Sequence, residues 1–476
     1  MAARLSPARK AALGALATAA RDGSYVRDVL DHARAVAALD ARDAGLARRL
    51  ALGVTACGGC LDEALDFHIA KPRQVAPRVR LALRVAAFEL MYLGTPPQAA
   101  VSQGVELVRA QAPHAAGFAN AVLHRLAEGA AGYLAAGDVP EEGAIAPHVD
   151  GRVSRRLVSA ARRAGMPVWL ASRIEGSLGP DAAHELFCAQ LEPAPVAVHA
   201  NPLAGIDISG SLAAGVPGCI IPNGLRALIS SGALGDGRAV ASDAHAQLVA
   251  TAATRAGSCL EIGAGRGTKT FIMCCQARRA GLSREHVALD LYPGKCKANL
   301  ERLAAGGLGH GVRAVAGDAR DLDSALGELD AGAGGRVLFD TVLVDAPCSG
   351  TGTMRRHPET PWRLEPEDAL AGLPSLQLEM LSCAASRVSP GGELLYATCS
   401  VLDCENVGVV DAFMRSPAGG RFGLAPVHEA EPFSYGVLEG AAKTALAHED
   451  ALGRFQTVPA PGGFDGHFCA RMVRLP

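Results

Sequence analysis

Two cysteines stand in short polar segments that follow apolar, strand-like stretches. Cys348 lies in the motif DAPCSGTG (345–352), and Cys399 lies in YATCSV (396–401). Most cysteines are buried and behave as small apolar residues. Here the surrounding Gly, Pro, Ser and Thr indicate loops, where reactive groups are displayed. Because a thiolate is a strong nucleophile, two thiols over one cleft indicate covalent catalysis.

A glycine-rich segment, EIGAGRGTK (261–269), follows the apolar stretch 258–262. Glycines at alternate positions remove Cβ atoms where a backbone approaches a ligand closely. A helix that begins there would point free N–H groups at an anionic or polar ligand. No Gly-Lys-Ser/Thr is present, which excludes a P-loop. The candidate cofactor loop is Gly263, Ala264, Gly265, Arg266, Gly267, Thr268 and Lys269.

Acidic residues follow three further strand-like stretches. Asp290 comes after 286–289, Asp318 after 312–316, and Asp345 after 341–344. A carboxylate in such a position can accept hydrogen bonds from the hydroxyls of a ribose. The pattern therefore predicts a nucleoside-type site, for which NAD and S-adenosylmethionine both remain open on these residues alone.

The elements that position these residues alternate between strand and helix after about residue 239. Strands are expected at 258–262, 286–289, 312–316, 341–344 and 393–396, with helices between them. Such alternation predicts a parallel, Rossmann-like α/β sheet. Because ligands of these sheets collect at the carboxyl ends of the strands, both cysteines and the acidic residues should meet at one edge.

The first part of the chain has a different pattern. Up to residue 133, Ala, Leu and Val recur at helical spacing, with no alternating strand pattern, which predicts an all-α domain. Residues 137–153 have the composition of a linker, and 154–238 predict a small α/β connector. The expected domains are 1–135, 136–238 and 239–476.

Composition limits the class of protein. The 476 residues are 49% hydrophobic with a net charge of −2, which excludes disorder and a uniformly basic nucleic-acid coat. Residues 1–130 hold 16 Lys and Arg against 11 Asp and Glu, whereas the remainder holds 30 against 37. One Cys57–Cys60 pair is half a zinc site, so we expect no metal. With no apolar run of spanning length, we expect no membrane segment and a cytoplasmic protein.

The motifs DAPCSGTG, RRHPETPW and YATCSVLDCEN closely resemble those of the RNA cytosine-C5 methyltransferases of the NOL/NOP/Sun family. The resemblance covers nearly the whole chain. Residues 1–133, with FANAVLHR (118–125), resemble the NusB-like helical RNA-binding domain of the members that act on 16S ribosomal RNA. The segments 242–247 and 466–471 resemble the start and the final strand of the catalytic domain.

The resemblance implies a role for each matched residue. Cys399 matches the nucleophile that adds to C6 of cytosine, and Cys348 matches the cysteine that assists product release. The loop Gly263 to Lys269, with Asp290, Asp318 and Asp345, matches the S-adenosylmethionine site. Asp345 could also stabilise N3 of the base. One departure is that the family loop usually reads CAAPGGK, whereas Arg266 replaces the proline here.

The alternatives concern the target. A transfer RNA is the second possible substrate, and a non-catalytic RNA-binding assembly factor is the third reading. We expect RNA rather than DNA as partner, and a monomer. Arg355, Arg356 and His357 could contact RNA phosphates or form a solvated loop, and Trp362 could stack on a base or pack locally.

Overall fold

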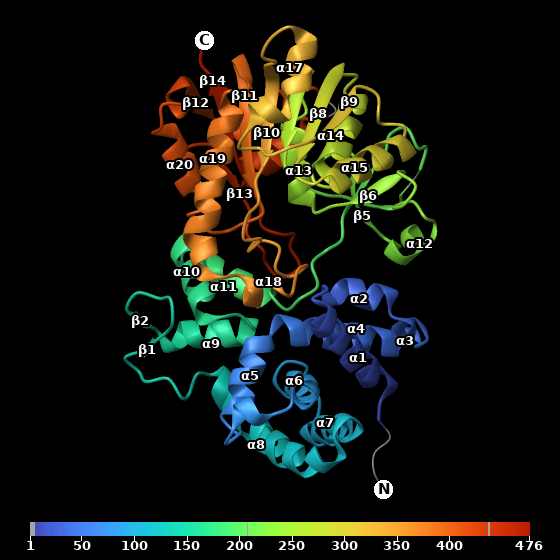
Figure 1. The fold of residues 1–476 in the computed structure, drawn as a ribbon, viewed down its shortest axis with the longest axis vertical. Helices are drawn as coiled ribbons and strands as arrows, with labels where there is room; N and C mark the ends of the chain where they lie inside the picture. Colours follow the sequence, from blue (N-terminus) through green and yellow to red (C-terminus); the bar gives the residue numbers. More distant parts are fainter. Residues whose placement is uncertain (1–4, 207, 437) are drawn as a thin grey trace. The chain divides into compact units, whose positions relative to one another are not determined.

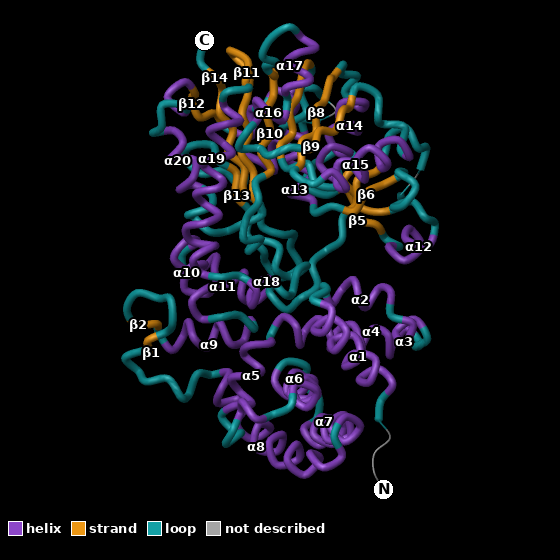
Figure 2. The backbone as a smooth tube through the Cα atoms, in the orientation of Figure 1, coloured by secondary structure: helices purple, strands orange, loops and turns teal. Residues whose placement is uncertain are grey.

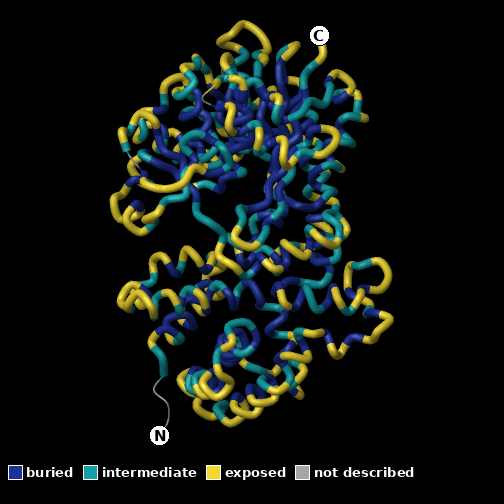
Figure 3. Tube along the Cα trace, turned by 180° about the vertical axis from the view of Figure 1, so that it is seen from behind, coloured by how far each residue is buried: buried dark blue, intermediate teal, exposed yellow. Residues whose placement is uncertain are grey.

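The computed structural model describes residues 5–206, 208–436 and 438–476. The chain forms two compact units (Figure 1). A helical unit comprises the residues up to 192 together with 354–366, and a sheet unit comprises 193–353 and 367–476. Each unit has its own buried interior (Figure 3). The division into three domains expected from the sequence, 1–135, 136–238 and 239–476, stays a prediction.

The helical unit confirms the all-α prediction for the N-terminal part of the chain. Its first eight helices are α1 (Pro7–Asp22), α2 (Val26–His32), α3 (Arg34–Ala37), α4 (Ala41–Ala56), α5 (Gly58–Asp66), α6 (Pro77–Met91), α7 (Pro97–Gln111) and α8 (Ala116–Leu134). The later elements are the short strands β1 (Ala144–Ile145) and β2 (Arg152–Val153) and the helices α9 (Arg155–Ala164), α10 (Val168–Leu178), α11 (Pro180–Ala189) and α18 (Thr360–Arg363).

Local sequence sets where these helices begin and how they pack. Proline stands in the first turn of α1, α6 and α7, where its missing N–H costs nothing. Asp40 caps α4 by accepting a hydrogen bond from the backbone N–H of Asp43, at 2.8 Å. In the core, Gly53 of α4 lies against the ring of Phe88, where an added Cβ would come within 1.9 Å of the ring. Close approach of α4 and α6 therefore depends on that glycine.

Residues 354–366 follow the first cysteine motif but pack within the helical unit. Nε1 of Trp362 donates hydrogen bonds to the backbone oxygens of Ala56, at 2.7 Å, and Gly165, at 3.0 Å. Its ring covers Gly59, where a Cβ would lie 2.0 Å from the ring. Of the two roles left open by the sequence for Trp362, local packing is therefore the one observed.

The main sheet of the second unit has eight strands within the described residues, in the order β12-β14-β11-β10-β7-β8-β9 with β13 paired to β14 (Figure 2). Strands β11, β10, β7, β8 and β9 are parallel to one another, and β14 pairs antiparallel with β11, β12 and β13. Their bounds are β7 (Gly257–Ile262), β8 (Arg284–Asp290), β9 (Val312–Ala316), β10 (Phe339–Asp345), β11 (Val388–Thr398), β12 (Phe422–Ala425), β13 (Phe455–Gln456) and β14 (Phe468–Arg474). All five predicted strands are confirmed.

Helices cover both faces of this sheet. The helices of the sheet unit are α12 (Leu225–Ser230), α13 (Ala244–Ala252), α14 (Thr268–Arg279), α15 (Pro293–Ala305), α16 (Leu322–Ala325), α17 (Gly327–Ala333), α19 (Leu373–Ala385), α20 (Val407–Met414) and α21 (Gly440–Leu446). One apolar cluster packs α13, α14 and α21 on the sheet, and a second packs α19 and α20 on it. Central strands buried on both faces explain the continuous apolar runs in their sequences.

A small antiparallel sheet of order β4-β5-β3-β6 belongs to the same unit. Its strands are β3 (Val198–Ala200), β4 (Gly210–Leu212), β5 (Cys219–Pro222) and β6 (Ala239–Ala241). Among the helices of the described ranges, none is long and apolar enough to cross a membrane.

The strand order places a topological switch point between β7 and β10. The chain runs from β7 outward to β8 and β9, then returns to β10 on the other side of β7. The loop after β7 therefore meets the end of β10, and a Cβ at Gly263 would lie 2.2 Å from the backbone oxygen of Asp345. Open α/β sheets bind their ligands at this kind of crossing.

Candidate active site

Cys348 and Cys399 lie beyond the carboxyl ends of the adjacent strands β10 and β11, with their Sγ atoms 3.3 Å apart. Both side chains are partly exposed. Their loops are joined directly, because the N–H of Gly352 donates to the backbone oxygen of Cys399 at 2.9 Å. The structure thus brings together the two thiols that the sequence places 51 residues apart.

The two thiols have opposite tendencies to ionise. The hydrogen bond from Cys348 lowers the pKa of Cys399; burial and the Asp345 carboxylate oppose this, and the Lys269 ammonium supports it. The same hydrogen bond raises the pKa of Cys348 well above its ordinary value, and burial adds to this rise. These directions favour Cys399 over Cys348 as the thiol of the pair that ionises first.

Lys269 and Asp345 form an ion pair beside the thiols, with Nζ 2.7 Å from Oδ2. Burial lowers the pKa of Lys269, but Asp345 more than offsets this and the net direction is upward. Burial raises the pKa of the Asp345 carboxyl, although Lys269 opposes this rise. A carboxyl with a raised pKa next to a fixed ammonium can share a proton with a ring nitrogen.

The glycine-rich loop between β7 and α14 has the geometry that its sequence predicts. Gly263, Gly265 and Gly267 have φ values of +79°, +59° and +80°, which side chains rarely adopt. A Cβ at Gly267 would lie 1.9 Å from Oδ1 of Asn299. The loop therefore presents bare backbone ahead of the first turn of α14. A polar ligand fits there because the helix N–H groups are available to it.

The other predicted cofactor residues surround this loop. Asp290 ends β8 and accepts hydrogen bonds from the N–H groups of Gly265 and Tyr292, both at 3.0 Å. Asp318 follows β9 and binds Arg320, whose guanidinium lowers the pKa of the Asp318 carboxyl. Asp290 thus contacts the loop, whereas the bonds described for Asp318 go to its neighbour in sequence.

The remaining loop residues differ in exposure. Ala264 is buried, whereas Arg266, which stands where the family usually has proline, is exposed. Oγ1 of Thr268 accepts a hydrogen bond from Arg302 at 3.0 Å. Arg266 also lies close enough to Arg302 to contribute to lowering the pKa of that guanidinium, after burial.

Two buried carboxylates of the site were not found from the sequence. Glu261, the last but one residue of β7, accepts hydrogen bonds from Thr270 at 2.6 Å and from His286 at 2.9 Å. Burial lowers the pKa of His286 despite this carboxylate. Glu405 lies beneath both cysteine loops. Its place in the motif YATCSVLDCEN, six residues after Cys399, was the available signal.

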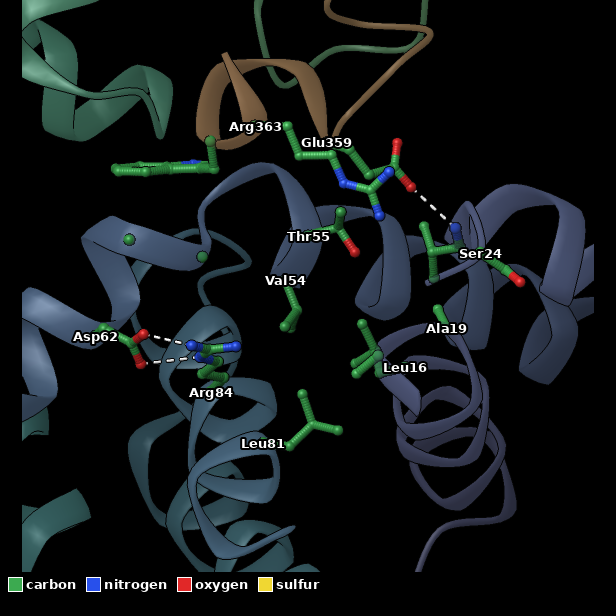
Figure 4. Close-up of a pocket in the computed structure, with 15 residues that line it drawn as sticks. Leu16, Ala19, Ser24, Val54, Thr55, Asp62, Leu81, Arg84, Glu359 and Arg363 are labelled. Carbon is green, nitrogen blue, oxygen red and sulfur yellow. Dashed lines mark hydrogen bonds and ion pairs between the residues drawn. The ribbon is translucent and has the colours of Figure 1, made fainter. Parts of the chain in front are cut away.

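A separate cavity of about 380 Å³ lies within the helical unit (Figure 4). Leu16, Val54 and Leu81 form its apolar wall. The bidentate ion pair between Arg84 and Asp62 closes one side. None of its lining residues belongs to the two cysteine motifs or to the glycine-rich loop 263–269.

Comparison with known proteins adds the family. The profile of the family described as 16S rRNA methyltransferase RsmB/F matches residues 253–473, and that of the NusB family matches residues 6–128. A solved structure titled PH0851 shares the fold, with a TM-score of 0.70 and 19% identity over 99% of each chain. A methyltransferase homologue from Pyrococcus horikoshii has a TM-score of 0.51 and covers 68% of this chain.

Two curated relatives match over almost their whole length. A protein of Mycobacterium tuberculosis described as a methyltransferase is 33% identical over 99% of this chain and 97% of its own. The ribosomal RNA small subunit methyltransferase B of Thermus thermophilus is 30% identical over 95% of this chain and 94% of its own. This chain therefore belongs to the RsmB/F family of 16S rRNA methyltransferases, with a NusB-type domain at its N-terminal end.

Proposed function

We propose that this protein methylates C5 of a cytosine in 16S ribosomal RNA, with Cys399 as the covalent nucleophile. The observation that carries the proposal is the pair of thiols 3.3 Å apart at the ends of β10 and β11, beside the Lys269–Asp345 ion pair. C5 of cytosine is a poor nucleophile by itself, and addition of a thiolate at C6 makes C5 enamine-like. Such covalent catalysis replaces one difficult step by easier ones.

S-adenosylmethionine is the methyl donor, and when bound it supplies an electrophilic methyl group. The residues that would hold it are the bare backbone of the 263–267 loop, the first turn of α14, and Asp290 at the end of β8. The Asp290 carboxylate suits the two hydroxyls of a ribose. Asp318, in the loop that follows β9, is a further candidate for the nucleoside.

The protein's own groups divide the remaining work. Cys399 Sγ forms the bond to C6, and the electron pair of the C5–C6 bond moves toward C5 and N3. Asp345, held by Lys269, stabilises N3 by sharing a proton. After methyl transfer the C5 proton passes to solvent water, the electron pair of the C5–H bond re-forms the C5–C6 double bond, and the pair of the Sγ–C6 bond returns to Cys399 as the thiolate. Cys348 assists this release.

Substrate access sets a further requirement. C6 lies in the plane of the base, so an attacking thiolate approaches from a ring face that stacking hides; the target must be unpaired or extruded from its stack. The NusB-type domain favours ribosomal RNA as the substrate. Its 16 Lys and Arg against 11 Asp and Glu in residues 1–130 favour RNA docking there. Arg355, Arg356 and His357 are further candidates for phosphate contacts.

The test is bisulfite sequencing of total RNA from cells with and without the gene, with methyl transfer to purified RNA as a second measurement. Loss of one protected cytosine in 16S RNA supports the proposal. Loss of a mark in transfer RNA instead would make that RNA the substrate. A folded protein whose removal changes no cytosine mark would be an assembly factor, and the proposal would be wrong.

A further inference from the structure

One buried carboxylate contacts the loops of both thiols. Glu405 is fully buried in the segment between β11 and α20. Its Oε1 accepts hydrogen bonds from the backbone N–H of Ser349, at 2.8 Å, and from Nε2 of Gln377, at 2.9 Å. Its Oε2 accepts from Oγ of Ser400, at 2.5 Å, and from Oγ of Ser349.

The two serines bound by Glu405 directly follow the two cysteines. Ser349 is the residue after Cys348, and Ser400 is the residue after Cys399. Their Oγ atoms are also 3.2 Å from each other, so both loops converge on the same carboxylate. Glu405 therefore binds the residue that follows each of the two thiols, whose Sγ atoms are 3.3 Å apart.

Thr351 links the same loops a second time. Its Oγ1 lies 3.0 Å from Oγ of Ser400 and accepts a hydrogen bond from the N–H of Val401 at 3.0 Å. Side chains of the first loop thus bind the backbone of the second. These hydrogen bonds between the two loops favour one loop geometry before RNA arrives.

In all four hydrogen bonds described for Glu405, its carboxylate is the acceptor. An ionised carboxylate only accepts, and the four bonds described for Glu405 come from an amide, a backbone N–H and two hydroxyls. All of these donors are uncharged, so its negative charge acts on the neighbouring thiols. It contributes to raising the pKa of Cys348, after the hydrogen bond to Cys399 and burial. Burying a charge costs free energy, so the packing of apolar residues does not account for a carboxylate at this position.

We propose that Glu405 is a positioning residue for the two-thiol reaction, which fixes both cysteine loops and, through its charge, keeps the shared proton on Cys348. The inference rests on the proposed function. The nucleophile must be a thiolate when the base arrives, whereas the second cysteine must keep its proton until release. The Glu405 charge, which contributes to raising the pKa of Cys348, provides that difference.

The decisive experiment compares alkylation of the two thiols in the native protein and in Glu405→Gln. Glutamine keeps the shape and removes the charge, and its amide can donate to the serine hydroxyls while its oxygen accepts from the two N–H donors. Brief iodoacetamide treatment, limited to a small modified fraction, is followed by mass spectrometry of the peptides that contain Cys348 and Cys399. Both side chains are partly exposed, so the reagent can reach them.

At neutral pH Cys399 should react faster than Cys348 in the native protein. In Glu405→Gln the ratio of the two rates should fall roughly tenfold, equivalent to about one pKa unit. Glu405→Asp, which keeps the charge, should retain most of the native ratio. An unchanged ratio in a folded Glu405→Gln protein would overturn the charge role.

The matched control is Glu393→Gln, which removes a buried carboxylate that binds Arg471 at 2.6 Å and makes no described bond to either cysteine loop. Its alkylation ratio should equal that of the native protein. If Glu405→Gln does not fold, Ser349→Ala tests the positioning role. That variant should lower kcat for methyl transfer roughly tenfold with an unchanged KM for the methyl donor, and an unaltered kcat would contradict it.

The alkylation experiment contains no RNA, which separates the two proposals. A native protein that methylates its target but shows no change of ratio in Glu405→Gln refutes only the inference about Glu405. A native protein that methylates no cytosine refutes the proposed function, whereas the thiol ratios still report on the carboxylate.

Discussion

Nζ of Lys269 lies 2.7 Å from Oδ2 of Asp345, so the first turn of α14 and the end of β10 are held together by an ion pair at the switch point of the sheet. The pair also sets the field at the nucleophile. Lys269 lowers the pKa of Cys399, whereas Asp345 raises it. The charges of both residues therefore enter the pH dependence of the reaction.

The rate of methyl transfer should rise with pH over the range in which Cys399 ionises. Only the thiolate attacks, so kcat/KM follows the ionisation of Cys399, whose lowered pKa places the rise below that of an ordinary thiol. Lys269→Met removes the ammonium and should move the rise to higher pH by about one unit. Initial rates measured across the pH range check this.

Lys297→Met is the control for that measurement. Lys297 is exposed on α15 and pairs only loosely with Glu301, at 3.8 Å. Its profile should overlay that of the native protein. A Lys269→Met profile that also overlays it would show that the ammonium does not assist the thiolate.

The two active-site cysteines should fail in different ways. Cys399→Ala removes the nucleophile and should abolish methylation. Cys348→Ala removes the group that assists release, and a covalent protein–RNA adduct should accumulate as a slow band on a denaturing gel. Cys404→Ala changes a partly exposed cysteine in the same motif and should do neither. Full activity of Cys399→Ala would refute the assignment.

Gly267→Ala should destabilise the loop before α14. The position has φ of +80° and a Cβ would lie 1.9 Å from Oδ1 of Asn299, so both strain and collision oppose the methyl group. We expect a loss of about 1–3 kcal/mol and weaker binding of S-adenosylmethionine. Gly294→Ala on α15 meets nothing within 4 Å and should be neutral or stabilising by less than about 1 kcal/mol. Thermal melts and calorimetric titration distinguish the two, and equal losses would refute the steric argument.

Trp362 should stabilise the helical unit. Trp362→Ala removes a ring packed on Gly59 and two hydrogen bonds, and should cost about 3–5 kcal/mol. Trp362→Phe keeps most of the ring and loses the Nε1 donor, so about 1–2 kcal/mol is expected. Urea unfolding followed by far-UV circular dichroism gives both values. Identical midpoints for the two variants would mean that packing of the ring contributes little.

Periodicity and motif spacing predicted much of this fold. The apolar runs that became β7 to β11 are buried on both faces, so their sequences differ sharply from the turns around them. Parallel strands carry the residues that follow them to one edge, which is why Cys348, Cys399 and Asp345 could be grouped from their positions alone.

The features that the sequence did not indicate depend on contacts across long separations. Glu405 belongs to the site because both cysteine loops bind it. One of its partners, Ser349, lies 56 residues away in the sequence. The sequence did not indicate to which unit Trp362 belongs, because its packing partners Ala56 and Gly165 are remote in sequence. The periodicity of a helix or strand does not indicate which residues far apart in the sequence will contact each other.

The position of segment 354–366 affects how the sequence can evolve and how chimeric proteins can be designed. The chain passes from one unit to the other after residues 192, 353 and 366, so the helical unit is assembled from two stretches of the gene. If only the N-terminal stretch were exchanged between relatives, Trp362 would have to pack against a different sequence. Its contacts with Ala56, Gly59 and Gly165 would then be replaced by those of the relative. The two stretches must therefore co-evolve, and a functional chimera has to transfer both.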